Sequence, residues 1–172
     1  MPSHPVVGET IVGEAKVISY EKGDPEIVVE NGDYYKVLEV GEIEEFDSTA
    51  LDGVRLKGRR ISIQNMVDEN TYYETMLLDG MTDEELNLVA KEISSTRRKY
   101  NDLIKENRNF IKDKIEFENA LKSDFISMYD IKYIPEAGMT PVVAKKRSMA
   151  YYYAITIHKA QGKEFENVFI HD

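Results

Sequence analysis

The chain contains no cysteine and only three histidines. The absence of cysteine excludes disulfides and thiolate metal sites, and it suits a reducing cytoplasm. The three histidines form no pair at helical spacing, so we expect no transition-metal site. No apolar run approaches the roughly 18 residues that a membrane helix needs, so we expect no membrane partner. Residues 1–5 lack the basic-then-apolar layout of a signal peptide, and we therefore expect a cytoplasmic protein.

What the chain does have is the composition of a soluble globular protein, with 172 residues, 42% of them hydrophobic and 31% charged. This length fits one ordinary domain or two small ones. The net charge of −10 is unusual for a protein that binds nucleic acid, because phosphate contacts need Lys and Arg.

The acidity is concentrated in the first third of the chain. Residues 1–53 hold 13 Asp and Glu against 3 Lys, whereas the remainder holds 19 residues of each sign. Three short basic clusters follow, at residues 55–60, 97–99 and 145–147. Solvated surface is the simplest interpretation of each cluster, and nucleic-acid contact is the alternative.

The first half of the chain has the texture of short strands. β-Branched and aromatic runs at 16–20, 26–30, 34–40, 54–57, 60–64 and 71–78 are separated by turn residues. Asn31-Gly32 predicts a tight turn, since both central positions of a type I′ turn need positive φ. Gly58 lies between the runs 54–57 and 60–64 and predicts a break there. Several short strands at this spacing favour a small SH3-like barrel.

Residues 82–123 show helical periodicity. Thr82-Asp83-Glu84-Glu85 is a capping box with acidic residues in the first turn, which suits the helix dipole. One unbroken helix of this length would span roughly 60 Å at 1.5 Å per residue. We therefore predict a break near residues 107–109 that folds the stretch into a helical hairpin, with its apolar stripe in a core.

The last part returns to α/β texture. Thr140–Ala144 is short and extended, and the apolar run 149–157 predicts a strand that ends in a polar, glycine-containing segment. Such a strand end places side chains at the carboxyl edge of an α/β sheet, where these folds bind ligands. Tyr151, Tyr152 and Tyr153 enter this strand; half-buried core is the favoured interpretation, and base stacking is the alternative.

This C-terminal segment resembles motif V of superfamily 1 DNA helicases, closest to the RecD/Dda branch. The residues that carry the resemblance are Tyr153-Ala154-Ile155-Thr156-Ile157-His158-Lys159-Ala160-Gln161-Gly162-Lys163-Glu164-Phe165, followed by Asn167-Val168-Phe169-Ile170. The pattern covers about a tenth of the chain. The turn Glu30-Asn31-Gly32-Asp33 is similar to the turn that precedes a barrel inserted into the second motor domain of that branch.

The resemblance implies roles for six residues. Thr156, His158 and Lys159 would contact single-stranded DNA, and such phosphate contacts position a strand without reading its sequence. The nucleotide cleft would use Gln161, Gly162 and Glu164, with Gly162 letting backbone amides approach a bound group closely. The implied cofactors of the parent enzyme are ATP and Mg²⁺, and none is expected in this chain alone.

Other parts of a phosphoryl-transfer site are missing from the sequence. No Gly-x-x-x-x-Gly-Lys-Ser/Thr loop occurs, because position 157 is Ile and position 164 is Glu around Gly162-Lys163. No apolar strand ends in a convincing Asp-Glu pair, and the arginine finger of the family would lie beyond residue 172. Since phosphoryl transfer needs these parts together, we expect no catalytic residue and no ATP hydrolysis from this chain alone.

The resulting expectation is an α/β fold, part of a RecA-like domain, with an inserted SH3-like barrel and a long helical hairpin. Residues 1–30 and 140–172 would belong to the second RecA-like domain, 31–78 to the barrel and 79–134 to the hairpin. The function expected is a fragment of an ATP-dependent DNA helicase, whose partners are single-stranded DNA and a first RecA-like domain upstream. One alternative is a non-motor module that binds nucleic acid or protein through the barrel and its basic segment 55–60. Another is a structural or dimerisation piece built on the helical hairpin.

Overall fold

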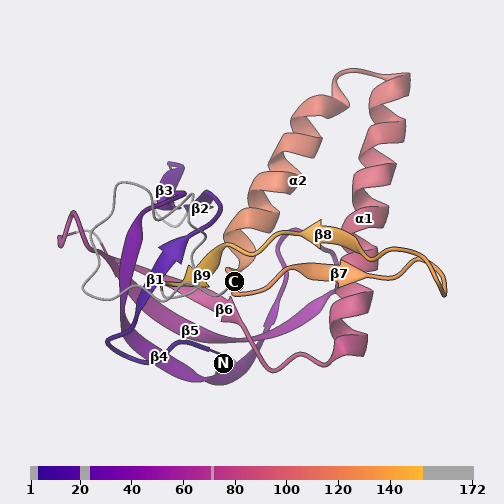
Figure 1. Ribbon diagram of the computed structural model, residues 1–172. Helices are drawn as coiled ribbons and strands as arrows, with labels where there is room; N and C mark the ends of the chain where they lie inside the picture. Colours follow the sequence, from indigo (N-terminus) through magenta and orange to yellow (C-terminus); the bar gives the residue numbers. More distant parts are fainter. Residues whose placement is uncertain (1–3, 20–23, 71, 153–172) are drawn as a thin grey trace, which may run out of the picture.

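The structure is a computed structural model that describes residues 4–19, 24–70 and 72–152. Nine strands and two helices lie within these residues, and Figure 1 shows their arrangement. The strands are β1 (Thr10–Gly13), β2 (Val17–Ser19), β3 (Glu26–Val29), β4 (Tyr34–Asp47), β5 (Arg55–Asn65), β6 (Tyr72–Leu78), β7 (Ile131–Tyr133), β8 (Val142–Lys145) and β9 (Met149–Tyr151), and the helices are α1 (Asp83–Glu106) and α2 (Phe110–Asp124).

The main sheet is antiparallel, with five strands in the order β6-β5-β4-β1-β9. β4 and β5 are its longest strands, and the register of their pairing shifts between Val37 and Glu39 and again between Val40 and Ile43. Such irregularities bend a strand and increase its twist. The pair therefore curves around a core, as Figure 1 shows. Two smaller antiparallel pairs, β2-β3 and β7-β8, complete the strands of the described residues.

Gly58 does not separate two strands as the sequence pattern predicts, because β5 runs through it without a break. A Cβ at this position would lie 2.5 Å from the carbonyl oxygen of Leu77 and 3.1 Å from Cε1 of Phe46. Glycine is required here because the backbone of β6 and the ring of Phe46 approach too closely for a side chain.

The tight turn predicted at Asn31-Gly32 is present, with Gly32 at φ 88°. Only glycines have positive φ among the described residues, so Asn31 has negative φ and the turn is not type I′. One left-handed residue is enough here, and Gly32 supplies it without steric cost.

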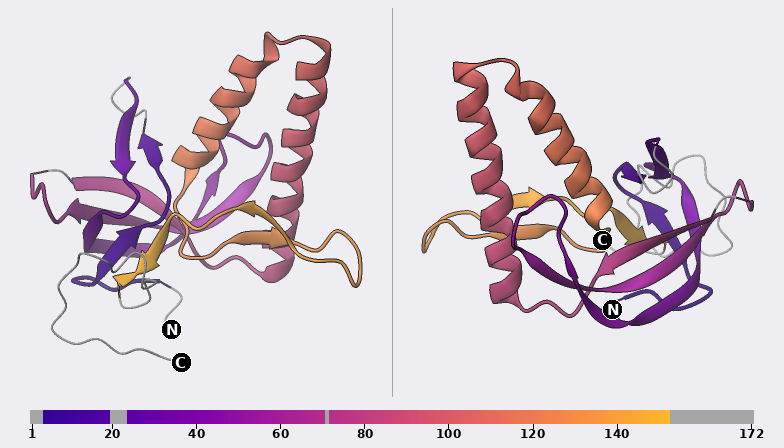
Figure 2. Two further views of the ribbon diagram at one scale, coloured as in Figure 1. Left: turned by 45° about the horizontal axis from the view of Figure 1, so that its top comes forward. Right: turned by 180° about the vertical axis from the view of Figure 1, so that it is seen from behind.

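The two helices begin and end where the sequence predicts. Both halves of the Thr82–Glu85 capping box form: the Thr82 hydroxyl accepts from the Glu85 amide at 3.1 Å, and the Glu85 carboxylate accepts from the Thr82 amide at 2.8 Å. The first helix ends at Asn107 and the second starts after Asn109, so the predicted break is confirmed. α1 leads away from the sheet, and α2 returns toward it from the far end of the hairpin (Figure 1 and Figure 2).

Two groups of buried side chains form the interior. The sheet core lies inside the curved sheet and comprises Ile11, Val17, Val28, Val29, Tyr35, Val37, Ile61, Ile63, Leu77, Ile126 and Met149. The helix core lies between the helices, the far end of the sheet and β7-β8, and comprises Leu51, Leu56, Leu78, Val89, Ala90, Ile93, Phe117, Leu121, Phe125, Ile131 and Ala144. Because β5 and β6 contribute to both cores, the two share the same strands.

The predicted α/β fold class, part of a RecA-like domain with an inserted barrel and a long helical hairpin, is wrong. Of the described residues, 38% are in strands and 28% in helices, and the two helices are the only ones there. A RecA-like sheet is parallel, and parallel strands need crossover helices between them. Here the strands of the main sheet pair antiparallel, and both helices follow β6 in the chain. The mostly β architecture therefore replaces the predicted α/β class.

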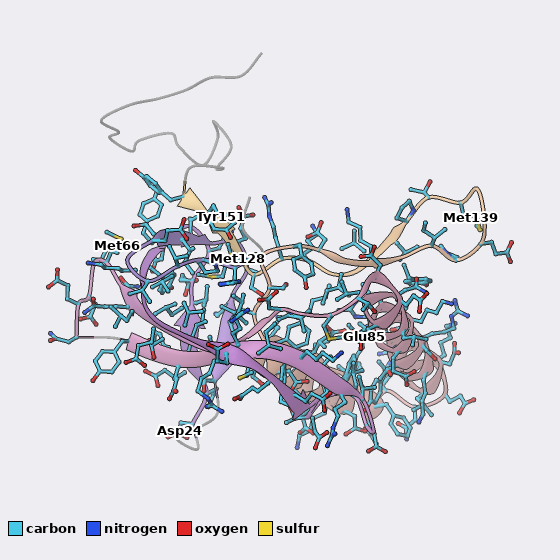
Figure 3. The ribbon with its side chains drawn as sticks, turned by 90° about the horizontal axis from the view of Figure 1, so that it is seen from below. Asp24, Met66, Glu85, Met128, Met139 and Tyr151 are labelled. Carbon is cyan, nitrogen blue, oxygen red and sulfur yellow. The ribbon has the colours of Figure 1, made fainter. Side chains whose placement is uncertain are left out.

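The β7-β8 hairpin is only half predicted. The extended stretch 140–144 corresponds to β8. β7 lies within residues 79–134, which the sequence assigns to the helical hairpin, so this strand was not predicted. The hairpin projects beyond the helices, with Met139 near its tip (Figure 3). Neither helix of the described residues is long and apolar enough to cross a membrane.

Candidate nucleic-acid interface

The six residues that the sequence assigns to the site all lie outside the described residues. They are Thr156, His158 and Lys159 for DNA, and Gln161, Gly162 and Glu164 for the nucleotide cleft. Their geometry therefore does not enter the description below. What the structure describes is the strand that leads to them, the basic clusters and the surroundings of each.

The strand β9 comes immediately before this segment and lies at the edge of the main sheet. It pairs with β1, where Ile11 faces Tyr151 and Gly13 faces Met149. The start of β9 is fixed by backbone bonds: the amides of Ser148 and Met149 donate to the carbonyl of Ser127, at 2.9 and 3.2 Å. The segment that follows is thus attached to a well-anchored strand.

The tyrosines at the end of β9 pack within the protein. Tyr151 is buried, with 7% of its surface exposed, which favours the core interpretation for this residue. Tyr152 is partly exposed, and its ring meets that of Tyr34 edge-to-face, with centroids 5.3 Å apart. Such edge-to-face pairs are a favoured aromatic geometry. Tyr153, the third member of the run, lies outside the described residues.

The basic segment 55–60 lies on β5, and its cations are paired with carboxylates of the same chain. On the exposed face, Arg55 contacts Glu45 at 3.2 Å and Asp47 at 3.4 Å. Arg60 contacts Glu44 at 3.4 Å and Glu74 at 4.0 Å. These pairs neutralise the charges that a phosphate backbone would need.

The remaining cations of the segment, Lys57 and Arg59, are less exposed than Arg55 and Arg60. Lys57 donates to Glu85 at 2.7 Å, which ties β5 to the first turn of α1. This hydrogen bond raises the pKa of Lys57, and it lowers the pKa of Glu85. Arg59 donates to the buried carboxylate of Asp79 at 2.6 Å and to the carbonyl of Gly41 at 3.1 Å.

Asp79 is the centre of a buried polar group at the end of β6. Its carboxylate also lies 3.3 Å from Nδ1 of His4 and accepts from the Gly80 amide at 2.9 Å. Burial raises the pKa of Tyr129 to about 12, and the negative charge of Asp79 adds to this effect. A buried carboxylate with this many hydrogen-bond partners stabilises the fold.

The other two basic clusters meet in space although they are far apart in the sequence. Arg97 on α1, together with Lys145 and Lys146 at the end of β8, lines a cavity of about 420 Å³. Lys16, directly before β2, and Lys122 on α2 line the same cavity. Sequence reasoning found the two clusters but not their meeting, and it missed these two isolated lysines because nothing in the local pattern marks them.

No group of three or more His, Asp or Glu side chains in the described part of the chain could hold a metal ion. The residues that the sequence assigns to ATP lie outside it.

No protein-family model matches the chain, and no curated protein matches it either.

Proposed function

We propose that this chain is part of an ATP-dependent DNA translocase, in which residues 153–170 touch both single-stranded DNA and the nucleotide. The proposal is supported by that segment, in which eight residue identities from Tyr153 to Phe165 follow the motif V pattern. Thr156, His158 and Lys159 are the proposed DNA contacts, because each can donate a hydrogen bond to a phosphate oxygen. The proposed residues of the nucleotide cleft are Gln161, Gly162 and Glu164.

The proposal gives the chain no ATP hydrolysis of its own. A phosphate-binding loop, the ligand of Mg²⁺ and the arginine finger would come from another part of the same protein, the first motor domain. The role of this segment is then to link the state of the nucleotide to the grip on DNA, and its partners are single-stranded DNA and that motor domain.

The ion pairs of β5 count against the alternative in which the basic segment 55–60 binds nucleic acid. Arg55, Lys57, Arg59 and Arg60 each have a carboxylate partner in this chain. A phosphate would have to displace these carboxylates before it could bind, which costs part of the electrostatic gain. Residues 153–170 therefore remain the better candidate.

The test is DNA-stimulated ATP hydrolysis by this chain joined to a motor domain that supplies the phosphate-binding loop. We expect single-stranded DNA to stimulate hydrolysis, and we expect His158→Ala to lower the DNA-stimulated rate about tenfold, the size of effect of one lost charge-assisted contact. His171→Ala is the matched control, because it changes the same residue type just outside the motif. The proposal fails if the joined protein shows no DNA-dependent hydrolysis, or if the two variants behave alike.

A further inference from the structure

The cavity between β2, the two helices and β8 is lined by basic side chains of four chain segments. Of the described charged residues that line it, five are basic and one is acidic: Lys16, Arg97, Lys122, Lys145 and Lys146 against Glu118. This balance is the reverse of that of the whole chain, which carries a net charge of −10. A concave site with one sign of charge concentrates the electrostatic field and attracts counter-ions.

Arg97 links the elements that surround the cavity. Its Nε and Nη2 donate to the two carboxylate oxygens of Glu118, at 2.7 and 3.0 Å, in a bidentate pair that joins the two helices. Its Nη1 donates to the carbonyl of Ala144 on β8. The pair consumes the one acidic residue of the lining, so the charge that remains in the cavity is that of the lysines.

The lysines of the cavity have few partners. Among the described residues, Lys16, Lys122 and Lys146 form no ion pair, and all three are exposed. Lys145 is less exposed: its Nζ lies 4.7 Å from the centre of the Phe125 ring and 3.5 Å from the Phe125 carbonyl. Burial lowers the pKa of Lys145 to about 8; the negative charge of Asp124 opposes this shift, and Arg97 and Lys122 add to it. An anion in the cavity would relieve this repulsion.

The walls of the cavity are held in place before any ligand arrives. The amides of Glu14 and Ala15 donate to the carbonyl of Ser148, at 2.7 and 3.2 Å, which fixes the segment that carries Lys16 against the end of β8. The Ser148 hydroxyl accepts from the Ser127 amide at 3.2 Å. Binding sites gain affinity when their charged groups are positioned in this way.

We propose that this cavity binds phosphate groups; the choice of a single-stranded nucleic acid as their source rests on the proposed function. Lysine ammonium groups bind phosphate as point charges and need no fixed geometry, which suits four flexible side chains around one cavity. A metal cation is repelled here, and an apolar ligand would leave the ammonium groups without counter-ions. The described residues that line the cavity all lie outside the motif V segment, so this proposal stands on different residues from the proposed function.

The first experiment measures binding of a fluorescently labelled oligothymidylate to the full chain at several salt concentrations. The test variant is Lys122→Gln/Lys146→Gln, which leaves the packed Lys145 in place. We expect it to weaken binding about tenfold and to reduce the slope of log K against log salt by about 1.4, the value for two phosphate contacts on a single strand.

The matched control is Lys91→Gln/Lys112→Gln, since both of these lysines are exposed on the helices and neither lines the cavity. The control changes the net charge by the same amount, and we expect it to change affinity less than about twofold. Equal loss in the two double variants would overturn the proposal, because it would show a general charge effect. Unchanged binding in the cavity variant would overturn it as well.

A second arm identifies the source of the phosphate. Inorganic pyrophosphate is titrated into the isotopically labelled chain, and the amide signals of Lys122, Lys146 and Ser148 are followed by NMR. Shifts with both the oligothymidylate and pyrophosphate support the nucleic-acid site. Shifts with pyrophosphate alone support a phosphate site for a small molecule and overturn the nucleic-acid ligand. No shift with either overturns the proposal. His158→Ala changes none of the described residues that line the cavity, so its effect on DNA-stimulated ATP hydrolysis tests the motif V proposal separately.

Discussion

At Asp79 a single buried carboxylate satisfies groups from three parts of the chain. Arg59 and Asp79 have side-chain exposures of only 17% and 9%, so neither charge is well solvated without the other. Asp79→Ala would leave a buried guanidinium without its counter-charge. We expect this variant to lower the free energy of unfolding by about 3 kcal/mol, measured by urea denaturation.

The control for Asp79 is Asp47→Ala, which removes one carboxylate from Arg55 on the same strand pair. These two side chains are 82% and 67% exposed, and surface pairs of this kind contribute less than about 1 kcal/mol. Similar losses in the two variants would show that the buried position of Asp79 has no special effect.

Lys145 makes the stability of the fold depend on pH. Burial lowers its pKa from 10.5 to about 8, with Arg97 and Lys122 contributing and Asp124 opposing. Between pH 8 and 10.5 the unfolded chain keeps this proton and the folded chain has lost it, so the stability of the native protein rises with pH across this window. Below pH 8 both states are protonated, and the folded state bears the full cost of the buried charge.

The matching experiment compares the native protein with Lys145→Met, which cannot titrate at this position. We expect Lys145→Met to have the higher free energy of unfolding at pH 7, and we expect the difference from the native protein to decrease as the pH rises toward 10.5. Tyrosines titrate in both proteins and cancel in the difference. A difference that stays constant with pH would contradict the lowered pKa.

At the scale of secondary-structure elements, Asp124 at the end of α2 holds the loop between β4 and β5. Its carboxylate accepts from the amides of Thr49 and Ala50, at 2.9 and 3.2 Å, and from the hydroxyls of Ser48 and Thr49. Asp124→Ala removes these acceptors together. We expect it to lower the unfolding free energy by about 2 kcal/mol, and to speed hydrogen exchange of the two amides at least about tenfold.

The comparison variant for Asp124 is Asp102→Ala on the exposed face of α1, where the carboxylate contacts only Lys105 at 3.3 Å. Exchange at Thr49 and Ala50 should stay as in the native protein. If this variant speeds exchange there as much as Asp124→Ala does, the loop is not held by the hydrogen bonds described.

Elements that depend on local chemistry are predictable from this sequence, and those that depend on distant contacts are not. The Thr82–Glu85 capping box and the break before Asn109 are local, and both are confirmed. Gly58 has the local appearance of a strand break, yet the approach of Leu77 makes it a necessary part of one long strand. β7 is formed by pairing with β8, which begins nine residues after it ends, and no local pattern announces it.

The candidate site follows the same division. The segment 153–165 is recognisable because its residue identities are contiguous, whereas the cationic cavity is assembled from four separate segments. Only Arg97 and the pair Lys145-Lys146 belong to clusters visible in the sequence. The pairing of the 55–60 segment with carboxylates is equally invisible, because Glu85 and Asp79 reach β5 only through the fold. The RecA-like class failed for a related reason, since antiparallel pairing is set by long-range contacts.

At the scale of the whole molecule, the sheet core and the helix core are joined through β5 and β6. Leu77 and Leu78 are neighbours on β6, yet the first is buried in the sheet core and the second in the helix core. Successive side chains of a strand point to opposite faces, which explains the division. Since β5 and β6 contribute side chains to both cores, we expect unfolding of either core to unfold the other.

We therefore expect Leu77→Ala and Leu78→Ala each to lower the unfolding free energy by about 2–5 kcal/mol and to leave a single cooperative transition. The measurement is urea unfolding followed by far-UV circular dichroism, which reports the helices, and by near-UV dichroism of the tyrosines. The control is Leu88→Ala on α1. Leu88 is 65% exposed, so this variant should change the free energy of unfolding little. If the two signals of either core variant have separate midpoints, the cores unfold independently and the shared strands do not couple them.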